Sequence, residues 1–169
     1  MLPSAHSGRF CGAWQRAELV SRITRPWGET HEKKKACPRI VHIAIKVDDL
    51  ERATKFYEEV FGFRQTSTGY ARGHVSRHLT DGNIDLALMV YDSEDVEEAQ
   101  LSGPGPCIHH WGIEVEDRDS YVSKIESNGG TIISEPGEGA LKFRAPDGTV
   151  AEIVGVGRYN KKKAEKAPA

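Results

Sequence analysis

The stretch Ile40–Asp49, IVHIAIKVDD, returns 68 positions later as Ile108–Asp117, IHHWGIEVED. Both copies alternate apolar residues with polar or small ones, which is typical of a strand with one face against a core. Each copy carries a histidine at its third position, His42 in the first and His110 in the second. A unit that occurs twice predicts two modules of the same architecture.

The residues after each copy predict one helix and three further strands. Asp48 or Asp49 can begin the first helix and Gly62 can end it, while Asp117 and Gly129-Gly130 do the same in the second copy. The strands are expected at about 64–68, 73–80 and 83–91, and again at about 131–134, 140–145 and 149–155. We therefore predict an α+β fold of two βαβββ modules in pseudo-symmetric pairing, which form a curved mixed sheet around a metal cavity with the helices outside.

The same pattern sets the expected domain limits. One domain covers residues 38–157, with modules at about 38–91 and 107–157 joined by the linker 92–106, which is rich in acidic residues, glycine and proline. Residues 1–37 are expected to be a poorly ordered N-terminal extension, and residues 158–169 a basic C-terminal tail.

Charge and cysteine content exclude several classes of partner. Residues 1–37 and 158–169 each carry a net charge of +4, whereas residues 38–157 carry −10. An acidic domain argues against nucleic acid as the partner, and no apolar run is long enough to span a membrane. The three cysteines form no CxxC pair, which favours a reducing, cytoplasmic location.

Four side chains are predicted metal ligands because they share the inner face of the sheet. Strand alternation places His42 and His110 on that face, and it places Asp85 and Glu152 there in the last strand of each module. Two imidazoles with one or two carboxylates suit a divalent ion such as Fe, Ni, Co, Mn or Zn. Asp85 is the weaker candidate because its side chain is shorter than that of Glu. By the same alternation, His109 is expected to point toward the helices.

Other residues on the inner face are candidates for substrate contact. Parity places His74, Ser76 and His78 inward in one strand, and Lys142 and Arg144 inward in its counterpart. We therefore predict four substrate-binding residues: Lys46, Ser76, Lys142 and Arg144. Arginine suits bidentate capture of a carboxylate or phosphate. The alternative is that these strand ends lie outside the cavity and are solvated.

Several motifs together resemble the vicinal oxygen chelate superfamily, which includes glyoxalase I, methylmalonyl-CoA epimerase, extradiol dioxygenases and bleomycin-binding proteins. They are VHIAIKVDDL at 41–50, FY at 56–57, FGF at 61–63, APDG at 145–148 and EI at 152–153. The resemblance covers about residues 39–156 and implies metal ligands at His42, His110 and Glu152. It implies a fourth ligand at Asp85, where the glyoxalase and epimerase branches usually carry Glu or Gln.

The resemblance also implies a homodimer, but it does not select one branch. The run Ile108-His109-His110 is similar to the epimerase branch, yet residues 64–80 hold no acidic residue to match the second base of that branch. Counterparts of the residues by which glyoxalase I holds glutathione are not evident either.

We expect a metal-dependent lyase or isomerase that acts on a small anionic, oxygen-rich substrate chelated to the ion. Glu152 is the expected proton shuttle, with Asp85 as its alternative, and His78 is an alternative general base. Two other functions stay open. One is an Fe(II) extradiol-type dioxygenase that uses His42, His110 and Glu152, and the other is a non-catalytic, bleomycin-resistance-like binding protein.

Overall fold

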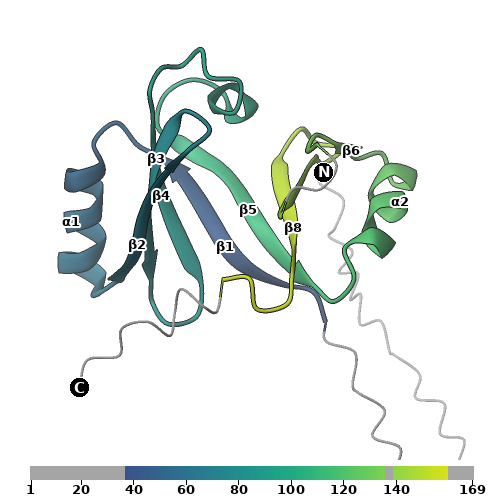
Figure 1. Ribbon diagram of the computed structural model, residues 1–169, viewed down its shortest axis with the longest axis horizontal. Coiled ribbons are helices and arrows are strands. Elements are labelled where there is room, and N and C mark those ends of the chain that lie inside the picture. Colours follow the sequence, from purple (N-terminus) through teal and green to yellow (C-terminus); the bar gives the residue numbers. More distant parts are fainter. Residues whose placement is uncertain (1–36, 136–138, 160–169) are drawn as a thin grey trace, which may run out of the picture. The chain divides into compact units, whose positions relative to one another are not determined.

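The computed structural model describes residues 37–135 and 139–159 of the 169-residue chain. These residues form an open, mixed sheet of eight strands in the order β2-β3-β4-β1-β5-β8-β7-β6, with two α-helices (Figure 1). The α+β fold is as predicted. The expected N-terminal extension, except for its last residue, lies outside the described residues. Positions 160–169 of the expected tail lie outside them as well.

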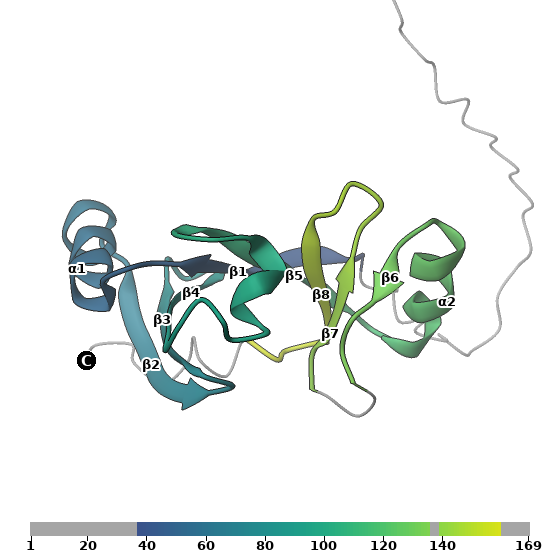
Figure 2. The same ribbon diagram turned by 90° about the horizontal axis from the view of Figure 1, so that it is seen from above.

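The two halves of the sheet have the same element order. The first half comprises β1 (Arg39–Lys46), α1 (Leu50–Phe61), β2 (Arg64–Ala71), β3 (His74–Thr80) and β4 (Asp85–Tyr91). The second comprises β5 (Cys107–Val115), α2 (Asp119–Ser127), β6 (Thr131–Ile132), β7 (Leu141–Arg144) and β8 (Val150–Gly155), and a short 3-10 helix, η1 (Ala99–Ser102), lies in the linker. The helices lie at the two ends of the sheet (Figure 2). None of the described helices has the length and apolarity needed to cross a membrane.

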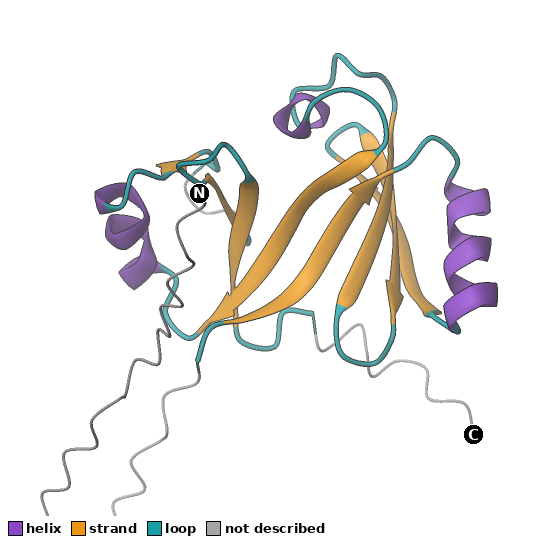
Figure 3. Cartoon of the chain, turned by 180° about the vertical axis from the view of Figure 1, so that it is seen from behind, coloured by secondary structure: helices purple, strands orange, loops and turns teal. Residues whose placement is uncertain are grey.

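The first strands of the two halves form the seam of the sheet. β1 pairs with β5 in antiparallel orientation, while β1 pairs in parallel with β4, and β5 in parallel with β8 (Figure 3). The last strands therefore lie next to the first strands, one on each side of the seam. Side chains at the strand centres of both halves consequently meet across it.

Local sequence signals account for helix α1. The carboxylate of Asp49 accepts a hydrogen bond from the Arg52 backbone N–H at 2.9 Å, and Gly62 ends the helix with a φ of 69°. Glycine reaches this left-handed conformation without a steric penalty. The inner face of α1 packs on a cluster built around Leu79, Leu86 and Leu88. Alternation along β4 leaves Ala87 and Met89 on the opposite face, in a second cluster with Ala44.

A β-bulge in β5 overturns one expectation. Ala44 pairs with His110 and Ile45 with Ile108, so that His109 is an extra residue between them. A bulge interrupts the alternation of side chains. His109 is therefore buried beside His110 and Tyr91 instead of pointing toward the helices.

Core packing continues past residue 157, the expected end of the domain. Tyr159 is buried in a cluster with Val41, Ala140 and Val154. The alternation used to set the limit stops with β8, and a single aromatic residue after a strand has no periodic pattern. Tyr159 therefore packs with the core although it lies in the expected tail.

Candidate metal centre and its cavity

A cavity of about 320 Å³ opens on the inner face of the sheet, around the seam. Its walls come from β1, the end of β2 and the turn after it, β3, β4, β5, β7 and β8, together with the linker and the segment after β8. The titratable residues on its walls include His42, His74, His78, Glu98, His110 and Glu152.

Three buried side chains from three strands converge in this cavity. His42 of β1, His110 of β5 and Glu152 of β8 each offer a ligand atom within 4.8 Å of the other two. His110 Nε2 lies 3.6 Å from Glu152 Oε2. Two imidazole nitrogens and a carboxylate oxygen are a donor set for a borderline divalent metal ion. The structure thus brings together three of the four predicted ligands.

Gly112 allows this close approach. In the sheet it lies opposite His42 on one side and opposite Glu152 on the other. A Cβ at this position would lie 3.0 Å from His42 Cβ and 3.2 Å from Glu152 Oε1. A side chain here would therefore push the two donors apart.

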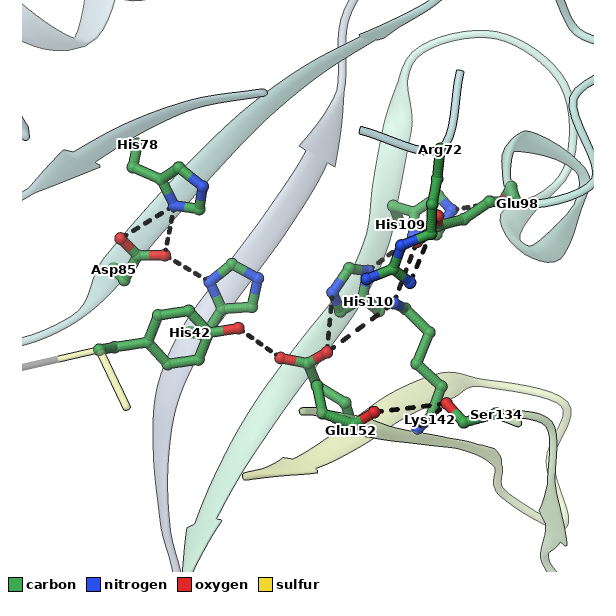
Figure 4. A network of polar contacts seen from close by, with 12 residues as sticks. His42, Arg72, His78, Asp85, Glu98, His109, His110, Ser134, Lys142 and Glu152 are labelled. Carbon is green, nitrogen blue, oxygen red and sulfur yellow. Dashed lines mark hydrogen bonds and ion pairs between the residues drawn. The ribbon is translucent and has the colours of Figure 1, made fainter. Parts of the chain in front are cut away.

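Asp85, the fourth predicted ligand, lies on the other side of His42 (Figure 4). Its Oδ2 is 2.7 Å from His42 Nδ1 and 2.8 Å from His78 Nδ1. Burial opposes ionisation of this carboxyl, but the hydrogen bonds from His42 and His78 outweigh it and hold its pKa far below its usual value.

An ionised Asp85 fixes the tautomer of His42. A carboxylate can only accept hydrogen bonds, so the His42 Nδ1 that faces it carries a proton, and Nε2 is the ring nitrogen left for another partner. Asp85 thereby holds His42 in the orientation that a ligating histidine needs. His42, His78 and Asp85 are also mutually close enough to form a second three-residue set.

His109 does the equivalent for His110. Burial, together with the nearby His42 and Lys142, lowers the pKa of His110 and keeps it neutral. Burial also lowers the pKa of His109, whose Nε2 donates to the Glu98 carbonyl at 2.7 Å. His109 Nδ1 therefore accepts a hydrogen bond from His110 Nδ1, 2.6 Å away, which leaves the lone pair of His110 on Nε2.

Tyr159 contacts two of the three converging residues. Its ring stacks on that of His42 at 4.4 Å with an interplanar angle of 8°. Its hydroxyl donates to Glu152 Oε1 at 2.5 Å. Burial and the adjacent Glu152 raise the pKa of Tyr159, so the phenol stays protonated and remains a donor. These contacts have no signal in the sequence, because Tyr159 lies in the segment expected to be the basic tail.

Ser76, His78 and Lys142 line the cavity, at the positions that alternation predicted. The Lys142 ammonium is buried, 3.0 Å from Glu98 Oε1 and 3.9 Å from Glu152 Oε2. Glu98 is a linker residue for which the sequence offered no periodic signal. It provides a second carboxylate in the cavity wall.

Lys46 and Arg144 are not on the cavity wall, contrary to expectation. Lys46 Nζ is buried against the linker, where it donates to Gly103 O at 2.6 Å and pairs with Glu94 at 2.9 Å. Arg144 donates to Gly148 O at 2.8 Å and lines a different pocket. Both have the predicted parity, but each is the last residue of its strand, and the cavity does not reach so far.

Residues 39–153 match the family model described as the Glyoxalase/Bleomycin resistance protein/Dioxygenase superfamily. The chain belongs to this superfamily. The match spans both halves of the sheet and includes His42, His110 and Glu152.

Within the superfamily, the chain is similar to curated lactoylglutathione lyases. One from Arabidopsis thaliana is 26% identical over 136 residues, which cover 72% of this chain and 45% of that protein. A probable chloroplastic enzyme of the same plant is 25% identical over 142 residues, which cover 79% of this chain and 35% of that protein. The matched part is thus less than half of either plant protein. The Haemophilus influenzae enzyme is 27% identical over 108 residues, which cover 59% of this chain and 74% of that protein.

Solved structures of superfamily members share the fold. Methylmalonyl-CoA epimerase from Mycobacterium tuberculosis aligns with a TM-score of 0.57 at 21% identity, over 69% of this chain and 86% of that one. A hypothetical protein from Bacillus halodurans aligns with a TM-score of 0.60 at 22% identity, over 79% and 100%. At such identities the likeness supports the architecture alone.

Proposed function

We propose that this protein is a metal-dependent lyase or isomerase of the glyoxalase and epimerase kind, acting on a small anionic, oxygen-rich substrate. One observation carries the proposal. His42 Nδ1 donates a hydrogen bond to Asp85 and His110 Nδ1 donates one to His109, so Nε2 is the ring nitrogen left for a ligand in both residues, and both residues converge with Glu152. Two imidazoles oriented in this way next to a carboxylate are what a catalytic metal site requires.

His42, His110 and Glu152 would hold the ion, and Asp85 and His109 would orient the two imidazoles. When bound, the ion supplies Lewis-acid polarisation of substrate oxygens. The names of the relatives favour substrates with a proton next to a carbonyl group. Chemistry of this kind needs a base that removes that proton and returns it.

Glu152 is the base that we propose. Its Oε1 accepts the Tyr159 hydroxyl proton in a hydrogen bond, and its Oε2 faces the substrate cavity near Lys142. Tyr159 and Lys142 therefore steady the carboxylate and limit where it can take a proton. His78 is the alternative base, because its Nδ1 donates to Asp85 and its basic nitrogen is Nε2.

The charge of the cavity wall supports an anionic substrate. Arg72, Lys142 and Arg158 line the cavity and balance the carboxylates of Glu98, Glu152 and the adjacent Asp85, so a bound divalent ion would make the site positive. A positive cleft concentrates anions.

Metal analysis followed by turnover assays tests the proposal. The full chain should bind one equivalent of Ni, Co, Mn, Zn or Fe. The loaded protein should then exchange the α-proton of a thiohemiacetal of glutathione or of methylmalonyl-CoA with solvent deuterium. Stoichiometric metal binding without exchange on a panel of such substrates would contradict the lyase or isomerase assignment, and absence of metal binding would contradict the metal centre.

A three-donor arrangement also supports the dioxygenase alternative. Asp85 is engaged with two imidazoles, and two histidines with one carboxylate match the facial triad of non-haem iron oxygenases. Oxygen consumption with a catechol by the Fe(II)-loaded protein, and not by the Ni-loaded protein, would favour this function over the first.

We also propose that the protein forms a homodimer. Helix α1 exposes Phe56, Val60 and Phe61, each more than half accessible, and apolar patches of this kind often mark protein interfaces. Sedimentation at tens of micromolar should give the mass of two chains, and a monomer at that concentration would oppose the assignment.

A further inference from the structure

Four polar side chains gather on one part of the cavity wall, and three of them, Arg72, Glu98 and Lys142, lie beside His110 on the side away from Asp85 and His78 (Figure 4). Three come from the sheet and the hairpin next to it: Arg72, His74 and Lys142. The fourth, Glu98, comes from the linker between the halves. All four line the cavity that contains the candidate metal centre.

Glu98 is the common partner of the two cations. Its Oε1 lies 3.0 Å from Lys142 Nζ and its Oε2 lies 3.6 Å from Arg72 Nη1, while its side chain is only 12% exposed. Burial opposes its ionisation, but Lys142 and Arg72 outweigh this effect and lower the pKa of Glu98. A carboxylate is therefore present between two cations in the cavity wall.

The hydrogen bonding of this group is incomplete. Among the described residues, Glu98 Oε2 and His74 Nδ1 are the buried side-chain atoms that have no hydrogen-bond partner. His74 is 93% buried, since only 7% of its surface is exposed. Buried polar atoms are nearly always satisfied, so two unsatisfied atoms on one cavity wall indicate a place for a polar ligand.

The side chain of Glu98 can leave its position without movement of the linker. The Glu98 carbonyl accepts a hydrogen bond from His109, and Lys46 holds the carbonyl of Gly103 and the carboxylate of Glu94. The backbone is thereby anchored. Glu98 also lines an adjoining pocket of about 340 Å³, which offers room for its carboxylate to rotate away from the cavity.

We infer that Arg72, His74 and Lys142 form a carboxylate-binding subsite, in which the Glu98 carboxylate stands where a carboxylate of the substrate binds. The inference rests on the proposed function, because it concerns the same cavity. Arg72 offers bidentate capture, Lys142 a point charge, and His74 Nδ1 a further hydrogen bond.

The position of the subsite narrows the substrate class. Lys142 Nζ is 3.9 Å from Glu152 Oε2, so a single lysine separates the subsite from the candidate metal centre. The substrate is a small carboxylic acid whose carboxylate lies next to the oxygens that bind at His42, His110 and Glu152.

Anion titration of the full chain tests the subsite, with succinate as the probe and isothermal calorimetry as the readout. Glu98→Gln removes the resident charge and should bind succinate at least about tenfold more tightly than the wild type. Glu97→Gln is the matched control, because it removes the same charge from the exposed neighbouring residue. It should bind succinate like the wild type.

Further variants separate a defined subsite from general attraction. The double variant Glu98→Gln/Arg72→Gln should lose the gain in succinate affinity that Glu98→Gln shows. If the subsite accepts any oxyanion, the affinities of the variants for inorganic phosphate should follow the same order. Equal affinities for succinate in Glu98→Gln and the wild type, or a gain that survives without Arg72, would overturn the inference. If Glu98→Gln does not fold, Glu98→Asp withdraws the carboxylate and should show an intermediate gain, and no gain there would overturn it equally.

The test does not depend on the metal or on turnover. It is run with and without added Ni²⁺, and the metal content is measured in parallel. If Glu98→Gln still binds metal but its succinate affinity equals that of the wild type, the subsite is contradicted and the proposed function is not. If the wild type does not bind metal but Glu98→Gln gains succinate affinity, the proposed function is contradicted and the subsite is not.

Discussion

Asp85 and Glu152 occupy corresponding places in the two halves of the sheet, yet their surroundings differ. Asp85 begins β4 directly opposite His42 and is held by two imidazoles. Glu152 lies opposite Gly112, two residues beyond His110, and is contacted by a phenol and an ammonium group. The first carboxylate therefore orients a histidine, whereas the second is placed to serve as a ligand.

A difference of one residue in spacing accounts for this. Asp85 follows its turn glycine, Gly82, by three positions, and Glu152 follows Gly148 by four. The Glu152 carboxylate reaches the seam because its spacing and its side chain are both longer, and because Gly112 has no Cβ in the way. The halves can thus share an architecture and still divide the work of one site between them.

The largest effect should distinguish the two possible three-residue sets. His110→Ala should abolish stoichiometric metal binding in calorimetry, because it removes one of two nitrogen donors. His78→Ala, the matched change in the set that contains Asp85, should retain wild-type affinity. The opposite result would move the metal to the first half.

Removal of Asp85 should weaken metal binding without abolishing it. Asp85→Ala leaves the His42 ring without its orienting acceptor, and losses of about 10–100-fold are usual for such partners. Asp85→Asn keeps one acceptor oxygen and should lose less. Affinities that match the wild type in both variants would show that the carboxylate does not orient the ligand.

Gly112→Ala should lower metal affinity by about tenfold, because donors displaced by a few tenths of an ångström no longer fit one ion. The new methyl would press on His42 and Glu152. Gly155→Ala is the control, since a Cβ there meets nothing within 4 Å. Wild-type metal affinity in Gly112→Ala would mean that the strands around Gly112 shift enough to keep His42 and Glu152 in place.

The two halves should begin to lose stability at different pH values when metal is removed by a chelator. The pKa of His110 is below its ordinary value of 6.5, so its contribution is complete above pH 6.5 and declines as the pH falls and the unfolded chain takes up the proton. The pKa of Asp85 is below its ordinary value of 3.8, so its contribution is lost only as the pH falls below that value.

Urea unfolding between pH 7 and pH 3 measures both contributions. His110→Phe should reduce the slope by up to about 1.4 kcal/mol per pH unit from pH 6.5 downward, the acid range included. Asp85→Asn should flatten the acid range alone. Parallel curves for the two variants would contradict the assignment of separate roles.

The smallest effect is expected at Tyr159. Tyr159→Phe keeps the stacking on His42 but removes the hydrogen bond to Glu152, a loss of about 1 kcal/mol, or roughly fivefold in metal affinity. Tyr159→Leu removes both contacts and should cost more. Equal losses in the two variants would assign the whole effect to the hydrogen bond and none to the stacking.

Periodic features of the sequence predicted the parts of the site that lie within regular strands. Alternation placed His42, His110 and Glu152 on the inner face because β1, β5 and β8 follow it there. The prediction for His109 was wrong because one extra residue in β5 breaks the alternation.

The other residues whose positions differ from prediction, or were not predicted, lie outside the strands or at their ends. Glu98 and Tyr159 belong to connecting segments, whose side chains are positioned by tertiary packing that no local pattern reports. Lys46 and Arg144 have the right parity but lie at strand ends, and how far a cavity extends along a strand depends on what covers it.

The seam between β1 and β5 has a consequence for folding in the cell. The three donors of the proposed centre are residues 42, 110 and 152, so neither half of the chain contains all three. A metal ion bound to them would tie together segments far apart in the sequence and would stabilise only the finished fold. During synthesis, metal binding to this set would have to wait until β8 has emerged and docked, and a chain without metal would remain exposed to proteases for longer.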